Sequence, residues 1–433
     1  MFDYQKINNT CVKCGKCIPV CTIYKIHPDE TTSPRGFIDL LGAYERGDLE
    51  LSKDAKKIFE TCFLCTSCTY VCPNKLPTDQ IIENVRRDIA EKFGIAWFKR
   101  AYFFLLRNRK IMDFAFKFGS YFTPLLFKNL PEKQSMKPRF PLPFVGNRVF
   151  IWLRPKSFME RYPEETRNSE GSKARRVAIF IGCLANYNYT RIGDSLMEIL
   201  KELKIDAFIP KAQQCCAAPA YFTGDFATVD KLIKQNVEYF ETFFDEIEAM
   251  IIPEATCSAM ILEDWAHFMH DQPLWRERIE KLLPKIYIAS DWLYHKTDLL
   301  ERLKSLNISM ERTITYHDPC HARKVLGIFK EPRELLRANY QIIEMSNPNQ
   351  CCGFGGVTLQ TERFALAEKV GDAKSEMIRE SGAQVVSAEC SACRMQLTNA
   401  LMQANVEVDF AHPLELIADA LRSAKVMRES QES

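Results

Sequence analysis

Two short stretches decide how the N-terminal part of this chain folds: residues 11–21 read CVKCGKCIPVC, and residues 62–72 read CFLCTSCTYVC. Both have the spacing C-x₂-C-x₂-C-x₃-C. Two residues between successive thiols let a short loop wrap a metal cluster and present three sulfurs to it, while the fourth thiol lies past a turn. The two runs therefore predict two metal centres, each with four thiolate ligands.

The spacing resembles that of bacterial ferredoxins with two cubane [4Fe–4S] clusters, in which the fourth cysteine of each run binds the other cluster. Zinc is the alternative, because C-x₂-C is also a zinc spacing. Zinc ribbons use two separated pairs, however, and not two runs of four. Thr22 stands where proline usually follows the first run, and this removes no ligand. The expected ligand sets are Cys11, Cys14, Cys17 and Cys72 for the first cluster, and Cys62, Cys65, Cys68 and Cys21 for the second.

The overall composition is that of an ordinary soluble protein, with 433 residues, 46% hydrophobic and 26% charged. This length predicts two to four domains. The net charge of +2 gives no field directed at nucleic acid. An odd total of 17 cysteines argues against a complete disulfide framework. The N-terminus has no apolar signal segment, and the longest apolar run, Ala101–Leu106, is too short to span a bilayer. We therefore expect a cytoplasmic protein with reduced thiols.

A helix is expected after Pro77, with Thr78 as its N-cap and Gly94 as its stop. Residues 95–130 are then rich in aromatic and basic residues. On a helical wheel Lys99 falls on a basic face opposite an aromatic face, whereas Phe103 lies off the apolar face. This pattern has two interpretations, a helix lying in a membrane interface or a helix docked on a partner or on the protein's own core.

The rest of the chain is divided by composition. Residues 131–172 have the proline and charge content of a linker. From Val177 onward, short apolar runs alternate with helical stretches, which predicts α/β domains with a largely parallel sheet. The expected strands are 177–181, 207–209, 249–252, 313–316, 384–386 and 406–408. The expected units are a two-cluster ferredoxin-like domain (1–94), an amphipathic segment and linker (95–172), and two related domains (173–305 and 306–433).

The remaining nine cysteines form an internal repeat. Cys183, the pair Cys215–Cys216 and Cys257 have counterparts about 135 residues later, which indicates a duplicated domain. The counterparts are Cys320, the pair Cys351–Cys352 and Cys390, and Cys393 completes the second copy as CSAC, where the first copy reads CSAM with Met260.

The second copy makes chemical sense at each position. Asp318 is expected to cap a helix and so place Cys320 at a helix N-terminus, where thiolate is favoured. The glycines that follow Cys352 let backbone N–H groups approach a cluster. Cys390 and Cys393 are expected to follow a strand and to share one helix face. Five thiolates are more than a zinc tetrahedron requires.

This arrangement resembles the CCG domain of heterodisulfide reductases and of the iron–sulfur proteins that serve glycolate oxidase, anaerobic glycerol-3-phosphate dehydrogenase and lactate utilisation. The resemblance implies an α+β multidomain protein, with a helical two-cluster ferredoxin domain followed by duplicated α/β CCG domains. It also implies a noncubane iron–sulfur cluster on Cys320, Cys351, Cys352, Cys390 and Cys393. The first copy, with Cys183, Cys215, Cys216 and Cys257, would hold a cluster, a zinc ion or nothing. His317 and His321, which flank Cys320, are expected to be hydrogen-bonding neighbours of the cluster and not its ligands.

Three functional hypotheses follow. The leading one is an oxidoreductase subunit without its own flavin, which passes electrons between an FAD-containing dehydrogenase and quinone or another carrier; its partner would oxidise glycolate, lactate or glycerol-3-phosphate. No G-x-G-x-x-G follows a strand, so dinucleotide binding is expected elsewhere. The second is a catalytic subunit that reduces a disulfide at the noncubane cluster. The third makes the repeats zinc-stabilised docking modules. On the leading hypothesis the protein is cytoplasmic, with peripheral contact at the inner face of the membrane through 95–130.

Overall fold

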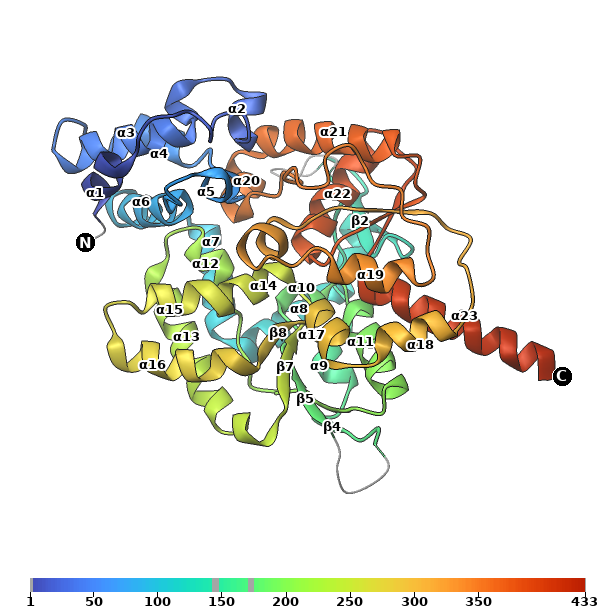
Figure 1. Cartoon of the computed structure of the whole chain (residues 1–433). Helices are drawn as coiled ribbons and strands as arrows, with labels where there is room; N and C mark the ends of the chain where they lie inside the picture. The colour runs from blue at the N-terminus through green and yellow to red at the C-terminus, as the bar shows by residue number, and fades with distance from the viewer. Residues whose placement is uncertain (1–2, 142–147, 170–174, 433) are drawn as a thin grey trace.

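The chain begins with a group of helices (Figure 1). The first cysteine run forms the connection between its first two helices, and the second run extends from a loop into the short helix Ser67–Val71. The structure is a computed structural model that describes residues 3–141, 148–169 and 175–432. The predicted boundary at residues 172–173 therefore lies outside the described residues. The helices of this first part are α1 (Tyr4–Thr10), α2 (Thr22–Ile26), a 3₁₀ turn (Glu30–Thr32), α3 (Pro34–Glu45), α4 (Lys53–Phe59), α5 (Ser67–Val71) and α6 (Thr78–Phe93).

Helix α6 packs against α3, α4 and α5, the helices that adjoin the two cysteine runs. Its buried face carries Ile81, Ile82 and Val85, which join the core formed with α3. The predicted stop at Gly94 is confirmed, because Gly94 ends the helix with φ 75°. The predicted N-cap is wrong: Pro77 is the cap residue and Thr78 is the first helical residue.

Helices α7 (Trp97–Arg107) and α8 (Arg109–Leu126) follow, and α7 contradicts the predicted wheel. Lys99 is buried, with its ammonium 2.7 Å from a Glu362 carboxylate oxygen and 3.0 Å from the Thr358 hydroxyl. Phe103 is fully buried as well. The lysine can point inward because the neighbouring carboxylate neutralises its charge. Many of the aromatic and apolar side chains point to solvent instead: Trp97, Phe104, Ile111, Phe114, Phe118, Tyr121, Phe122, Leu125 and Leu126.

Among the described residues, no helix is both long and apolar enough to cross a membrane.

The predicted linker contains structure that composition did not show. Strands β1 (Phe127–Leu130), β2 (Ser135–Pro138) and β3 (Phe150–Ile151) form an antiparallel sheet in the order β1-β2-β3. Gln134, at the turn, is completely buried and donates a 2.8 Å hydrogen bond to Glu415 near the C-terminus. This long-range contact holds the segment against the second repeat.

The first repeat is built on a five-stranded sheet in the order β4-β6-β5-β7-β8. All pairs are parallel except β4–β6 at the edge. Helices cover the sheet, as the strand–helix alternation predicts. Its strands are β4 (Glu165–Thr166), β5 (Arg176–Ile179), β6 (Asp206–Phe208), β7 (Ala249–Ile252) and β8 (Ile286–Ile288). Its helices are α9 (Phe158–Arg161), α10 (Cys183–Tyr187), α11 (Arg191–Glu202), α12 (Ala218–Tyr221), α13 (Phe226–Glu241), α14 (Ala255–Ala259), a π-helix (Met260–Asp264), α15 (Trp265–Phe268), α16 (Pro273–Leu282), α17 (Ala289–Lys296) and α18 (Leu299–Ser305), with 3₁₀ turns at Phe244–Glu246 and Leu283–Lys285.

The second repeat has a parallel sheet in the order β11-β10-β9. The strand predicted at 406–408 is wrong. The amide of Val406 closes the end of α22 on Leu401, so the strand ladder starts only at Asp409. The elements are β9 (Ile314–Tyr316), a π-helix (His321–Val325), α19 (Glu331–Arg337), α20 (Gly356–Glu362), α21 (Phe364–Glu380), β10 (Val385–Ser387), α22 (Ser391–Gln403), β11 (Asp409–Ala411) and α23 (Pro413–Glu432).

The two repeats share a hydrophobic core and an extensive interface. One hydrophobic core takes residues from both repeats, and α23 of the second packs on α11 of the first. A buried carboxylate of each repeat also bonds a serine of the other: Glu254 accepts the Ser391 N–H at 2.8 Å, and Glu389 accepts the Ser290 N–H at 3.0 Å. This interface places the cysteines of both repeats near one another.

Candidate metal centres

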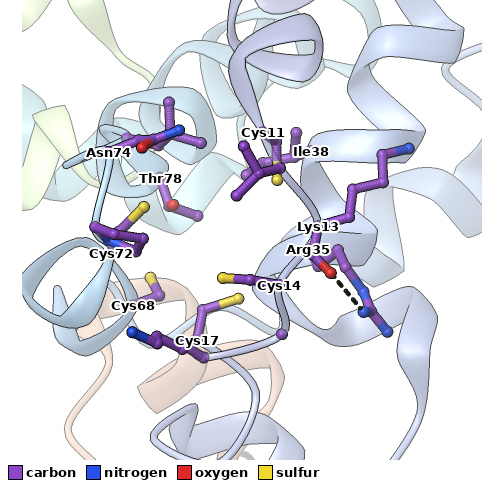
Figure 2. A pocket seen from close by; sticks show the side chains of 15 residues that line it. Cys11, Lys13, Cys14, Cys17, Arg35, Ile38, Cys68, Cys72, Asn74 and Thr78 are labelled. Atoms are coloured by element: carbon purple, nitrogen blue, oxygen red, sulfur yellow. Dashed lines mark hydrogen bonds between the residues drawn. The ribbon is translucent and has the colours of Figure 1, made fainter.

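The first ferredoxin-like site is a pocket at the protein surface (Figure 2). Three thiols of the first run line it together with Cys68 and Cys72 of the second, and Cys68 also lines the second pocket. Cys14 is exposed. Arg35 donates a 3.2 Å hydrogen bond to the Lys13 carbonyl and so fastens the loop. The structure thus brings together Cys11, Cys14, Cys17 and Cys72.

The second ferredoxin-like site lies deeper. Its pocket is lined by Cys21 of the first run and by three cysteines of the second, with Phe63 and Leu64 as apolar walls. The Leu64 amide lies 3.4 Å from the Cys62 sulfur, which is the N–H···S contact that thiolate ligands of clusters receive. The gathered set is Cys21, Cys62, Cys65 and Cys68.

The two cysteine loops share one backbone conformation. The residues before and after the second cysteine of each run have positive φ: Lys13 (54°) and Gly15 (78°) in the first, Leu64 (49°) and Thr66 (54°) in the second. Left-handed backbone is unfavourable for leucine and especially for the β-branched threonine. Strain of this kind persists where the surroundings require it, and here it curls each loop around its pocket.

In the second repeat all five cysteines are buried. Cys320 follows β9, Cys390 and Cys393 follow β10, and the pair Cys351–Cys352 follows the parallel bridge of Ile342 with Ile314. The ends of parallel strands meet at one sheet edge. The Cys352 and Cys393 sulfurs are 3.5 Å apart, and the Gly353 amide is 3.4 Å from the Cys351 sulfur. The converging set is Cys320, Cys351, Cys352, Cys390 and Cys393.

The residue that follows each cysteine pair needs a left-handed backbone. Gly353 has φ 91°, and a Cβ there would lie 2.9 Å from the Ala367 carbonyl oxygen. In the first repeat Ala217 occupies the same place with φ 80°. Alanine pays about 1–2 kcal/mol for that conformation. The turn after the pair is therefore retained in the first repeat even though its glycine is not.

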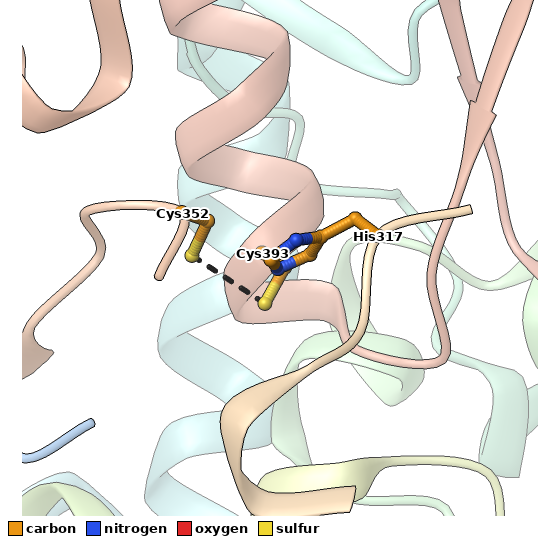
Figure 3. Close-up of side chains that lie close together, drawn as sticks. All are labelled: His317, Cys352 and Cys393. Atoms are coloured by element: carbon orange, nitrogen blue, oxygen red, sulfur yellow. Dashed lines mark hydrogen bonds between the residues drawn. The ribbon is translucent and has the colours of Figure 1, made fainter. Parts of the chain in front are cut away.

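His317 lies against the cysteines of the second repeat (Figure 3). Its ring is fully buried, and a ring nitrogen and the sulfurs of Cys352 and Cys393 lie within 4.8 Å of one another. Burial lowers the pKa of His317, so the neutral ring is favoured. Neither ring nitrogen has a nitrogen or oxygen partner in the described part of the chain. The imidazole is therefore directed at sulfur.

His321 faces another direction. Its ring stacks on Phe222 of the first repeat at 5.6 Å between centroids, and its Nδ1 is 3.4 Å from the Thr256 hydroxyl. Burial lowers the pKa of His321 to about 4. The expected helix cap at Asp318 is wrong: this buried carboxylate binds Arg323 and Arg333 instead, because charged donors outcompete backbone amides.

The first repeat also gathers its thiols. The Cys183 and Cys215 sulfurs are 3.3 Å apart, and Cys216 and Cys257 line the same cavity. Four converging thiols fit a cluster or a zinc ion equally well by donor chemistry.

The structure corrects how the two repeats correspond. Helix α14 begins after Glu254 and helix α22 begins after Cys390, and both cap residues have extended backbone (φ −142° and −161°). Counted from these caps, Cys257 corresponds to Cys393. Glu254, and not Met260, is therefore the residue that replaces a cysteine in the first repeat. Both repeats contain the letters CSA, at Cys257 and at Cys390. Aligning the repeats on these letters places their helices three residues out of register.

The second ferredoxin-like site and the second repeat are in direct contact. Cys65 and Cys351 line the same cavity, and the neighbouring Cys351 thiol is the main influence that lowers the pKa of Cys65. Lys324 lies beside this contact, with its ammonium 2.7 Å from the Ser67 hydroxyl and 3.6 Å from the Cys320 sulfur. Burial lowers the pKa of Lys324, but nearby thiolates, Cys320 first, outweigh burial and raise it. A permanent positive charge therefore lies between the two centres.

One cavity of about 480 Å³ reaches the cysteines of both repeats. Its walls are mainly apolar and rich in phenylalanine. The sequence carries no signal for it, because its residues come from segments more than three hundred positions apart, from Phe63 to Asn399, and share no motif. The aromatic lining residues are Phe63, Phe98, Tyr102, Phe150, Phe222, Phe354 and Phe364.

Comparison with known proteins agrees with this architecture. The family model described as a cysteine-rich domain matches residues 177–262 and 314–398, and the model described as a 4Fe-4S dicluster domain matches residues 7–76. Lactate utilization protein A of Halalkalibacterium halodurans is 31% identical over 245 residues, 56% of this chain and 96% of the relative. The chain belongs to the family of iron–sulfur proteins with cysteine-rich CCG domains.

Two further relatives support the assignment. The probable glycolate oxidase iron-sulfur subunit of Bacillus subtilis is 27% identical over 399 residues, covering 89% of this chain and 87% of the relative. Lactate utilization protein A of Bacillus subtilis is 29% identical over 245 residues, covering 56% and 98%. The α+β architecture, with a dicluster domain before duplicated CCG domains, is confirmed. The chain is thus an iron–sulfur electron-transfer protein of the oxidoreductase class.

Proposed function

We propose that this chain is the electron-transfer subunit of a respiratory 2-hydroxy-acid dehydrogenase, linking an FAD-containing subunit to quinone. The proximity of Cys65 and Cys351 carries the proposal, because it brings the second ferredoxin-like site next to the cysteines of the second repeat in one cavity. The relatives named for glycolate and lactate favour a 2-hydroxy acid over glycerol-3-phosphate as the partner's substrate.

The proposed metal content follows the donor sets. The two pockets of residues 1–94 would each hold a cubane [4Fe–4S] cluster, and the five buried cysteines of the second repeat a noncubane one. Cys183, Cys215, Cys216 and Cys257 would hold a metal centre of their own. Each cluster would take up and release one electron at a time.

Exposure suggests where a partner meets this relay. The loop of the first site has an exposed Cys14 and a Val12 side chain that is 66% exposed, whereas the centres beyond it are increasingly buried. A docked dehydrogenase would therefore exchange electrons at this loop. The 2-hydroxy acid would lose two electrons and two protons to the flavin within the partner, and the reduced flavin would pass its electrons singly to this loop.

Membrane contact is part of the proposal. The solvent-facing aromatic residues of α7 and α8, with Lys110 and Lys117 on the same helices, fit a helix pair lying in the headgroup region at the inner face of the cytoplasmic membrane. Neither helix buries these aromatic side chains against the described part of the protein.

The first test is iron, acid-labile sulfide and zinc per chain after purification without oxygen. Two cubanes alone give about 8 iron atoms, and a third cluster gives about 12. The second test adds a lactate or glycolate flavoprotein dehydrogenase and its substrate, and follows bleaching of the cluster absorbance. We expect Cys65→Ser to slow reduction of the repeats' centre and to leave the first site reducible. About 8 iron with one or two zinc, or no substrate-dependent bleaching, contradicts the proposal.

A further inference from the structure

The cavity between the repeats has the size of a ligand site. Its volume is about 480 Å³, of which clusters on the two cysteine sets would occupy a part, and pockets for small organic molecules typically measure roughly 300–1,000 Å³. It touches Cys183 and Cys257 of the first repeat and Cys320 and Cys390 of the second. A molecule in this cavity would therefore lie beside both sets of cysteines.

The walls select for a flat, apolar molecule. Phenylalanine rings from five parts of the chain line the cavity, and aromatic rings favour stacking with planar partners. The lining surface is mainly apolar, although polar side chains such as Arg148, Glu254 and Gln396 also reach it. His321 contributes an imidazole to the wall, braced by the stack on Phe222, and such a ring donates or accepts a hydrogen bond. This is the pattern of a site that holds an apolar ring and orients it through a few oxygen atoms.

Helix α7 connects the cavity to the exposed aromatic face. Phe98, Lys99 and Tyr102 line the cavity, while Trp97 and Phe104 on the same helix are 75% and 47% exposed. Phe98 itself is 36% exposed and so belongs to both surfaces. Lys99 is neutralised by Glu362 and leaves no free charge at this wall. An apolar chain attached to the bound ring can therefore leave along the aromatic side chains of α7, with the exposed Arg100 of the same helix beside its path.

We propose that this cavity is a quinone-binding site, with the ring between the two cysteine sets and the isoprenoid chain along the aromatic face of α7. The inference rests on the proposed function, in which quinone is the electron acceptor. The quinone takes two electrons, delivered singly from the reduced iron–sulfur centres, and two protons from water, and two O–H bonds form on the ring to give the quinol. The 2-hydroxy acid oxidised by the partner dehydrogenase is the reductant.

The test measures quinone binding on the full, cluster-loaded chain without dehydrogenase. Menadione is titrated while the redox potential and EPR signal of the repeats' clusters are recorded. Val357→Trp places an indole into the cavity wall, and Phe114→Ala is the matched control on the exposed face outside it. We expect menadione to shift the signal, with affinity weakened about tenfold or more by V357W and changed less than about twofold by F114A.

A photoreactive azidoquinone provides a second readout that needs no variant. Labelled peptides are expected from α7 and α20, which form the cavity wall. Labelling elsewhere, or equal affinities in the unchanged chain and V357W with full iron content, overturns the site. Absence of binding in a chain that still passes electrons from dehydrogenase to a soluble dye overturns the site and leaves the proposed relay standing. Reduction of a small disulfide without quinone binding overturns it in favour of a disulfide substrate.

Discussion

The charge of Lys324 is the feature whose removal has the most calculable effect. Its ammonium lies 3.6 Å from the Cys320 sulfur and 3.3 Å from the Cys65 carbonyl oxygen, between two centres that each gain negative charge on reduction. With an effective dielectric constant of about 20, one unit charge at that distance from the sulfur contributes about 4.6 kcal/mol, or about 200 mV for one electron. The added electron is spread over the whole cluster, so the expected shift is smaller, roughly 50–100 mV.

We therefore expect Lys324→Met to make the potential of the second-repeat cluster, and of the second cubane, more negative by that amount. Redox titration followed by EPR measures both potentials on anaerobically purified protein. Lys324→Arg keeps the charge and should restore most of the shift, and Lys330→Met removes an exposed, solvent-screened charge and should change little. Unchanged potentials in fully loaded K324M would refute the argument that this ammonium tunes the relay.

Three further predictions follow from single contacts. Glu254→Cys, at the position that corresponds to Cys390, should create a five-thiolate cluster in the first repeat and add about four iron atoms per chain. Met260→Cys should add no iron. A gain of iron only in M260C would show instead that Met260 occupies the position of the missing cysteine. Burial raises the pKa of Glu415, but Arg394, the His412 amide and the Gln134 side chain together outweigh burial and lower it to about 2. The contribution of Glu415 to stability is therefore complete above about pH 4.5 and is lost as the pH falls through about 2. Glu415→Gln should lower the free energy of unfolding, measured in urea at neutral pH, by about 3–5 kcal/mol. Equal stability of the variant and the unchanged chain would contradict this. Phe114→Glu should reduce sedimentation with anionic vesicles several-fold with iron content unchanged, and unaltered sedimentation would exclude α8 from the membrane contact.

The sequence alone determined the chemistry of the ligands and the order of the domains. The spacing within each cysteine run is a local property, because a few residues of loop decide which thiols can surround a cluster. The repeat of cysteine pairs also survives in the linear chain, so duplication was readable from Cys215 and Cys351. Strand–helix alternation predicted the parallel sheets, since a strand buried on both faces is a continuous apolar run.

Only the tertiary structure decided how these parts face one another. A helical wheel shows two faces but not which of them meets the core, and the partner Glu362, far away in sequence, turned Lys99 inward. The equivalence of Glu254 with Cys390 depends on where a helix begins after its strand, which identical letters at shifted positions concealed. The Cys65–Cys351 contact and the aromatic cavity arise where segments distant in sequence pack together. Such placements depend on the sum of many long-range contacts, and no local pattern of residues encodes them.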